Sequence, residues 1–252
     1  QACPMPTAVL TSQTGFKSFY CNDCTDKLDY YTSEWKKLGF QPNGIYTGFL
    51  SSEKQVDKIL DFINSFETEN TLVLVDPVMG DGGRTYSLFT DALACKMKKL
   101  VTVADVITPN LTECCILCDI DYSDFIKSAD NPDFMDKVAE LGKSLLKRYG
   151  VKIVIITGIE HKDIDGTMYV QNLIASKDEV FSVSCKKIGG SYSGTGDLFA
   201  SVMFSGLLRG DTLRDTVSLA VKFIETSLRD TVALGIDRNE GIEFEKHLKI
   251  LL

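Results

Sequence analysis

Residues 71–81 read Thr-Leu-Val-Leu-Val-Asp-Pro-Val-Met-Gly-Asp, and this stretch decides the class of fold. Residues 72–75 form an unbroken apolar run, which is expected of a strand buried on both faces. Such strands occur in parallel sheets that carry helices on both sides. The run ends at Asp76, and Asp81 follows shortly after it. Ligands of open α/β sheets bind beyond the carboxyl ends of the strands, so both carboxylates stand where a functional site is expected.

Strand and helix patterns alternate on both sides of this stretch. Further strands are predicted at residues 7–11, 44–48, 101–107 and 151–156, and helices at residues 25–38 and 132–149. Another helix begins at Ser51 or Ser52, because a serine cap is followed by apolar residues at helical spacing up to Phe66. Strands that alternate with helices of this length indicate βαβ units and a mostly parallel sheet.

The pattern changes at Gly166. Residues 167–170 and 180–184 are predicted to be antiparallel strands joined by a polar turn, and two helices follow, at 195–208 and 212–234. The predicted fold is therefore α/β, with a largely parallel central sheet flanked by helices and an antiparallel addition over residues 166–184. No repeat or linker interrupts the pattern, so residues 1–252 are expected to form a single domain.

Composition and charge narrow the choice of partners. The chain has 252 residues, a net charge of −8 and a pI of about 4.9. This acidic balance argues against nucleic acid or an anionic membrane surface as a partner, since both require a basic face. The sequence contains no run of eighteen apolar residues, so no transmembrane helix is predicted, and the first residues do not resemble a signal peptide. A cytoplasmic location is therefore predicted.

The eight cysteines allow two interpretations. The pairs Cys21/Cys24 and Cys115/Cys118 have the spacing of half zinc sites. Zinc ribbons, however, separate such pairs by roughly 15–20 residues, and these pairs lie much farther apart in the chain. Reduced thiols that act as small hydrophobic side chains are the favoured interpretation, and zinc is the alternative.

The sequence Gly194-Thr195-Gly196-Asp197 opens one of the predicted late helices. The first N–H groups of a helix have no intrahelical partner, and together with the helix dipole they form a site for an anion such as phosphate. Two glycines let the backbone approach the anion closely. Asp197 would lie beside a phosphoryl group there and could accept a proton from an attacking hydroxyl. The simpler alternative is a tight turn followed by a residue that favours a helix N-terminus.

Polar residues also follow the other predicted strands. Asp76, Asp81 and Glu113 converge on one sheet edge in the predicted fold, which suits Mg²⁺, although each is equally explained as a loop or capping residue. Asn110 could donate to phosphate oxygens. Thr108 and Thr157 each end a strand, and they either offer oxygens to a monovalent cation or simply finish the strand.

Taken in order, these segments resemble the signatures of pyridoxal kinases of the ribokinase-like superfamily, which have a three-layer α/β fold. The likeness covers essentially the whole chain. The segments that carry it are 10–16, 46–49, 76–81, 108–113, 157–158 and 194–200. The resemblance implies ATP-dependent phosphorylation of the 5′-hydroxymethyl group of pyridoxal, pyridoxine or pyridoxamine, with Mg²⁺ and a potassium-type ion. It also implies a homodimer.

The resemblance assigns roles residue by residue. It implies that Asp197 is the catalytic base and that Gly194, Thr195 and Gly196 form the anion hole. The implied ATP contacts are Asp76, Asn110, Thr157, Ile188 and Thr195. The implied contacts to the vitamin are Thr14, Phe49 and Asp197. The implied metal ligands are Asp81 and Glu113 for Mg²⁺, and Asp76, Thr108 and Thr157 for the monovalent cation.

The chain departs from the family at two places. The family begins with a strand, a serine-bearing loop and a first helix that have no counterpart before Gln1, so a segment of roughly 30 residues is expected to be missing. Gln13 stands where the family often has His, which affects recognition of the ring. Two rival functions remain: a hydroxymethylpyrimidine phosphate kinase, which usually has Cys in place of Asp197, and a catalytically silent relative that binds nucleotide or pyridoxal phosphate.

Overall fold

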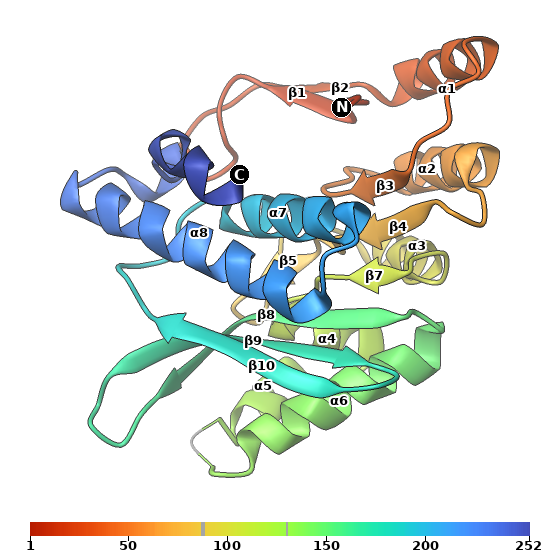
Figure 1. Ribbon diagram of the computed structural model, residues 1–252. Coiled ribbons are helices and arrows are strands. Elements are labelled where there is room, and N and C mark those ends of the chain that lie inside the picture. Colours follow the sequence, from red (N-terminus) through yellow and green to blue (C-terminus); the bar gives the residue numbers. More distant parts are fainter. Residues whose placement is uncertain (87–88, 130) are drawn as a thin grey trace.

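A six-stranded mixed sheet forms the centre of the computed structural model, which describes residues 1–86, 89–129 and 131–252 (Figure 1). The strand order is β10-β9-β8-β7-β4-β3. The strands are β3 (Gly44–Thr47), β4 (Leu72–Val75), β7 (Val106–Ile107), β8 (Ile153–Lys162), β9 (Met168–Ser176) and β10 (Val180–Lys186). β3, β4, β7 and β8 pair in parallel, whereas β9 and β10 are antiparallel. The predicted parallel sheet and its antiparallel addition after Gly166 are confirmed.

Helices cover both faces of the sheet, so the predicted three-layer architecture is also confirmed (Figure 1). One face carries α2 (Glu53–Phe66), α3 (Asp91–Val101), α4 (Leu111–Cys118) and α6 (Phe134–Tyr149). The other face carries α7 (Thr195–Arg209) and α8 (Leu213–Ala233). The side chains of β4 alternate between the two cores, Val73 and Val75 toward the first group of helices and Leu74 toward the second. This alternation explains the unbroken apolar run, because every residue of the strand is covered.

Two strand predictions were partly wrong. Residues 101–107 do not form one strand, because Val101 ends helix α3 and only Val106 and Ile107 enter the sheet. Thr102 closes the helix by a turn, and the Val73 N–H donates to the Asp105 carboxylate. Val101 is buried by packing in the core rather than by strand pairing, and tertiary contacts of this kind override β-propensity.

The second error concerns the strand predicted at 151–156, which continues as β8 to Lys162. Its pairing with β9 is interrupted between Ile156 and Ile159, so Thr157 and Gly158 form a bulge inside the strand and not a loop after it. Gly158 adopts a φ of +69°, which explains the glycine. The Thr157 N–H donates to the Pro109 carbonyl at 2.9 Å, which brings the bulge to the start of α4.

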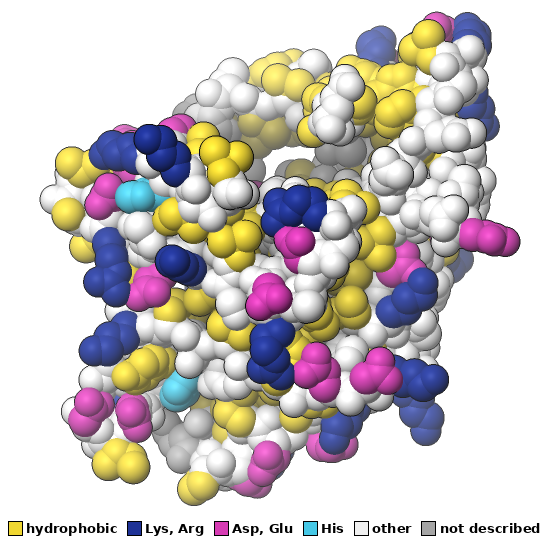
Figure 2. All heavy atoms as spheres, in the orientation of Figure 1, with side chains coloured by type: hydrophobic (Ala, Val, Ile, Leu, Met, Phe, Trp, Pro, Cys, Tyr) yellow, Lys and Arg dark blue, Asp and Glu magenta, His cyan; other side chains and the backbone are white. Residues whose placement is uncertain are grey.

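The N-terminal residues form an arm outside the sheet. A hairpin of β1 (Ala8–Leu10) and β2 (Cys21–Asp23) leads through η1 (Thr25–Lys27) into α1 (Leu28–Lys37). A hollow separates this arm from the body of the molecule in Figure 2, where acidic and basic side chains are interspersed. Two short strands, β5 (Gly80–Asp81) and β6 (Arg84–Thr85), and one short helix, α5 (Tyr122–Ile126), complete the regular elements before β8. Among the described helices, none is long and apolar enough to cross a bilayer.

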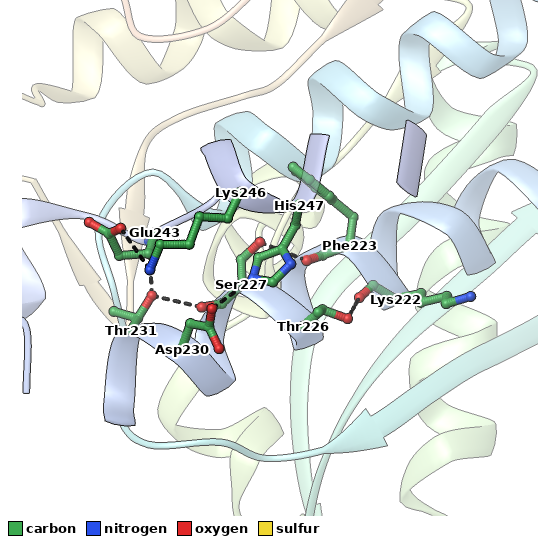
Figure 3. Close-up of polar contacts among 9 residues, drawn as sticks. All are labelled: Lys222, Phe223, Thr226, Ser227, Asp230, Thr231, Glu243, Lys246 and His247. Carbon is green, nitrogen blue, oxygen red and sulfur yellow. Dashed lines mark hydrogen bonds and ion pairs between the residues drawn. The ribbon is translucent and has the colours of Figure 1, made fainter. Parts of the chain in front are cut away.

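The C-terminal segment packs on helix α8 through polar contacts (Figure 3). Thr231 is fully buried; its Oγ1 donates to the Ser227 carbonyl at 2.8 Å and accepts from the Glu243 N–H at 2.9 Å. His247 Nε2 lies 3.1 Å from Asp230 Oδ2. These bonds hold η2 (Arg238–Glu240) and η3 (Glu245–Leu251) near the end of α8.

Replacing Thr231 by valine should destabilise the protein. The change keeps the shape of the side chain, but it removes the acceptor of the Glu243 N–H and leaves a buried donor without a partner. We expect Thr231→Val to lower the free energy of unfolding by about 1–3 kcal/mol, measured by urea denaturation. Thr226→Val is the matched control, since the exposed Thr226 hydroxyl bonds only the Lys222 carbonyl of its own helix. An equal effect of both variants would contradict this role for Thr231.

Candidate active site

Helix α7 begins with the glycine-rich loop that the sequence singled out. Gly194 is the N-cap residue and has a φ of +81°, a conformation that strongly favours glycine. Thr195 Oγ1 donates to the Tyr192 carbonyl at 3.1 Å, and in the described residues no side chain caps the helix. The first N–H groups of α7 therefore point outward without a side-chain acceptor. This geometry is that of an anion site at a helix N-terminus.

Asp197 lies in the first turn of α7 and faces the end of β3. Burial raises the pKa of its carboxyl above the ordinary value, while a hydrogen bond from the Tyr46 side chain lowers it. The net direction is upward because the loss of solvation outweighs the favourable interactions of the anion. A carboxylate with a raised pKa is a better proton acceptor.

Asp76 follows β4 directly and is buried, with 9% of its surface exposed. The Thr108 hydroxyl donates to its Oδ1 at 3.1 Å, and the Asp76 N–H donates to the Thr47 carbonyl at 2.9 Å. Burial raises the pKa of Asp76 to about 7; the Thr108 hydrogen bond opposes this shift and the charge of Asp197 adds to it. The two carboxylates therefore lie within electrostatic reach of each other.

The raised pKa of Asp76 predicts a pH-dependent stability. The folded state holds this proton up to about pH 7, whereas the unfolded chain releases it near 3.8, so stability should fall as the pH rises through this window. In metal-free buffer, Asp76→Asn should remove the decline and raise the free energy of unfolding at pH 8 by about 2–4 kcal/mol. The asparagine oxygen can still accept from Thr108. Asp178→Asn, in the exposed turn between β9 and β10, is the control, and an equally steep decline in Asp76→Asn would contradict the assignment.

Asn110 and Glu113 form a capping box at the start of α4. The Asn110 side chain accepts from the Glu113 N–H at 3.0 Å, and Glu113 Oε2 accepts from the Asn110 N–H at 2.9 Å. Asn110 Nδ2 also donates to the Gly80 carbonyl, and Glu113 Oε1 accepts from the Met79 N–H at 3.0 Å. Both side chains thus fix the acidic loop after β4 to helix α4. Burial raises the pKa of Glu113 well above its ordinary value.

The charges of the four predicted acidic residues all act on one phenol, that of Tyr86. Burial raises the pKa of Tyr86 to about 12, and the charges of Glu113, Asp81, Asp76 and Asp197 all add to the shift. The predicted convergence of these carboxylates at one sheet edge is therefore visible in their electrostatic coupling. Asp81 itself is exposed and accepts from the Gly82 N–H at 2.8 Å. In the described part of the chain, no group of three or more His, Cys, Asp or Glu side chains is arranged to hold a metal ion.

The predicted vitamin contacts come from two segments beside these loops. Thr14 is exposed in the loop between β1 and β2. Next to it, Gln13 Nε2 donates to Ser193 Oγ at 2.8 Å, and Ser193 is the residue immediately before Gly194. Phe49 is half-buried just after β3, and its carbonyl accepts from Thr7 Oγ1. A cavity of about 550 Å³ opens beside the Thr14 loop; it is lined by Gly15, Phe16, Lys17, Ser18, Asp237 and Asn239.

The remaining predictions are placed as follows. Ile188 is half-buried after β10, before the glycine-rich loop. Thr157 pairs with Asn110 through a parallel bridge, so both lie at the edge where Asp76 and Thr108 end their strands. Cys24, Cys114 and Cys115 are buried, and all eight cysteines have free thiols.

Sequence reasoning missed Tyr46 and Tyr86. Tyr46 is the residue whose side chain lowers the pKa of Asp197, and it lies inside β3, where a tyrosine is an ordinary strand residue. Tyr86 belongs to the loop after β6 and carried no motif. Only the fold shows that both phenols lie among the carboxylates.

Comparisons with known proteins show which proteins this chain resembles. The profile of the family described as phosphomethylpyrimidine kinase matches residues 34–241. A Bacteroides thetaiotaomicron protein assigned as a phosphomethylpyrimidine kinase, crystallised with pyridoxal, is 37% identical with a TM-score of 0.90, over 100% of this chain and 85% of its own. A Schizosaccharomyces pombe protein assigned as a pyridoxal kinase is 29% identical over 207 residues, 80% of this chain. A Haemophilus influenzae hydroxymethylpyrimidine/phosphomethylpyrimidine kinase is 27% identical, over 79% of this chain and 70% of its own.

The chain spans 57% of the length of the S. pombe relative. The family match covers most of the chain and includes β3, β4, the acidic loop and the start of α7. The resemblance inferred from the motifs is thereby confirmed at the level of the family. The chain belongs to the phosphomethylpyrimidine kinase family.

Proposed function

We propose that the full-length protein is an ATP-dependent pyridoxal kinase, which phosphorylates the 5′-hydroxymethyl group of pyridoxal, pyridoxine and pyridoxamine. The observation that carries the proposal is the pairing of Asp197, a carboxylate with a raised pKa, with the uncapped N-terminus of α7. One group accepts a proton and the other binds the phosphoryl group that is transferred. The relative crystallised with pyridoxal and the relative assigned as a pyridoxal kinase support this choice of acceptor.

The residues of the chain divide the work of phosphoryl transfer. The N–H groups of Gly194, Thr195 and Gly196 stabilise the charge on the phosphoryl oxygens, a contribution that is often the largest in such reactions. Asp197 accepts the proton of the vitamin hydroxyl as this hydroxyl attacks the γ-phosphorus and the bond to the ADP oxygen breaks. Thr14 and Phe49 hold the vitamin ring, and Asn110, Thr157 and Ile188 contact the nucleotide.

We also propose that the site takes up Mg²⁺ and a monovalent cation. Four carboxylates lie within electrostatic reach of Tyr86, and in the described residues no Lys or Arg is among the groups that shift the pKa of Asp76, Glu113 or Asp197. Cations that arrive with the nucleotide would relieve this repulsion. Asp81 and Glu113 would hold Mg²⁺, and Asp76, Thr108 and Thr157 would hold the monovalent ion. When bound, these ions neutralise phosphate charge.

Three further expectations belong to the proposal. We infer that the protein is a homodimer, that it acts in the cytoplasm and that residues 1–252 form one kinase domain. Analytical ultracentrifugation tests the dimer, cell fractionation tests the location, and limited proteolysis tests the single domain.

An acceptor panel tests the proposed function. ATP turnover by the full-length protein should be observed with pyridoxal, pyridoxine and pyridoxamine, each compared with hydroxymethylpyrimidine. Hydroxymethylpyrimidine is the alternative acceptor because the H. influenzae relative is named as a kinase of this compound. Turnover with hydroxymethylpyrimidine alone would assign the enzyme to that reaction. Nucleotide binding without turnover of any acceptor would identify a silent relative.

A further inference from the structure

Tyr46 lies within electrostatic reach of two carboxylates of the site, the buried Asp76 and the exposed Asp197. Both Asp76 and Asp197 contribute to raising the pKa of its phenol, after burial as the main cause. Its backbone lies in β3 opposite Leu74, and the next residue, Thr47, accepts the Asp76 N–H at 2.9 Å. The tyrosine is therefore fixed to the same pair of strands that positions Asp76.

Packing against α7 directs the Tyr46 side chain toward Asp197. Its ring lies against Phe204, with 6.2 Å between the ring centroids. Asp197 and Phe204 are about two turns apart on α7, so they share one face of the helix. The Tyr46 side chain therefore extends along the face of α7 that carries Asp197, and the two groups affect each other's pKa.

Gly44 explains why the helix can lie so close to β3. A Cβ atom on Gly44 would be 2.5 Å from Phe204 Cζ and 2.9 Å from Leu208 Cδ2. Along β3, Gly44 therefore meets the C-terminal half of α7, and Tyr46, on the same side of the strand, lies closer to the start of the helix. Strand and helix run in opposite directions at this contact, which places the phenol next to the first turn of α7.

We propose that Tyr46 is a positioning residue: its hydroxyl donates a hydrogen bond to Asp197 and holds this carboxylate oriented toward the vitamin hydroxyl. The inference rests on the proposed kinase function. A phenol on a strand, wedged against Phe204, has few alternative rotamers. It therefore restricts the carboxylate more firmly than water would. Catalytic hydrogen bonds are often loose in a free enzyme and tighten when substrates bind.

A double-mutant cycle tests the role of Tyr46 in turnover. Tyr46→Phe should lower kcat about 10-fold, the effect of losing one hydrogen bond to a charged group, and leave KM for ATP and pyridoxal unchanged. In an Asp197→Asn background the same change should have no effect, because the oriented carboxylate is absent. Tyr149→Phe is the matched control. It also removes a half-buried phenol, which donates to the Leu117 carbonyl at 2.7 Å on the face of the sheet opposite α7, and kcat should not change.

A second measurement does not depend on turnover. Carboxyl ¹³C NMR, with the Asp197 signal assigned from its loss in Asp197→Asn, should show a higher pKa for Asp197 in Tyr46→Phe than in the wild type. Among the described residues, the titratable groups that interact with Asp197 are Tyr46 from β3, Asp76 from the loop after β4 and Tyr86 from the loop after β6. An unchanged kcat, an equal effect in both backgrounds or an unchanged pKa of Asp197 would overturn the proposal. Wild-type protein without turnover would refute the kinase function instead, and the NMR titration would still decide the role of Tyr46.

Discussion

Asp197→Asn should reduce turnover with pyridoxal by about 10²–10⁴-fold, the range typical for loss of a general base. The substitution keeps the size of the side chain and its place in the first turn of α7, but it removes the proton acceptor and one negative charge. Nucleotide affinity, measured by calorimetry, should be retained or rise slightly. The reason is that Asp197 adds to the negative charge around Asp76, and its removal relieves repulsion of the phosphates.

A second helix provides the control for this substitution. Asp215 lies in the first turn of α8, where it bonds Thr212 at the N-cap, and it is remote from the acidic loop in sequence and fold. Asp215→Asn therefore makes the same change at an equivalent helical position. It should lower stability slightly and leave kcat unchanged. Full turnover in Asp197→Asn would show that Asp197 only favours the start of the helix, and the base would have to be another residue.

Gly194→Ala should reduce kcat by about 10²–10³-fold, the cost of losing one donor of an oxyanion hole. Gly194 has a φ of +81°, and an alanine there costs about 1–2 kcal/mol or forces the backbone to rotate. Rotation would turn the N–H groups of the loop away from the phosphoryl group. No atom lies within 4 Å of the position that the new methyl group would take, so the strain comes from the backbone alone.

The other end of the same helix offers a matched control. Gly210 is the C-cap of α7, has a φ of +87° and also has open space around the position of a Cβ. Gly210→Ala should destabilise the protein by a similar amount, again about 1–2 kcal/mol, without affecting kcat. Both variants are compared by urea denaturation and by turnover. Equal turnover in the two variants would contradict an anion site at residues 194–196.

Much of the fold could be predicted because buried strands leave a recognisable apolar pattern in the sequence. Residues 72–75 are apolar throughout because helices cover both faces of β4, and the change at Gly166 marks the start of the antiparallel pair. The segment 101–107 was misjudged because Val101 and Val103 suit a strand as well as a buried helix end. The strand predicted at 151–156 ended too early because Thr157-Gly158 resembles a loop. Only the pairing of β8 with β9 and the hydrogen bond from Thr157 to Pro109 show that these two residues form a bulge.

The candidate site was predictable only where a local motif carries the chemistry. The glycine-rich loop and Asp197 are adjacent in sequence, so the pattern alone placed a possible base next to an anion site. A capping role was weighed for Glu113, but its partner in the capping box, Asn110, was assigned only to phosphate, although the spacing of the box is visible in the sequence. Tyr46 could not be found this way. Its role depends on the packing of β3 against α7, which connects residues that are distant in the chain.

The most direct test of the account is a crystal structure of the full-length protein with pyridoxal, Mg²⁺ and a non-hydrolysable ATP analogue. The account predicts the γ-phosphate on the N–H groups of residues 194–196. It also predicts the 5′-hydroxyl of the vitamin within hydrogen-bonding reach of Asp197, at about 2.6–3.2 Å. A nucleotide bound with its phosphates away from the start of α7, or a vitamin hydroxyl that contacts a different base, would contradict it.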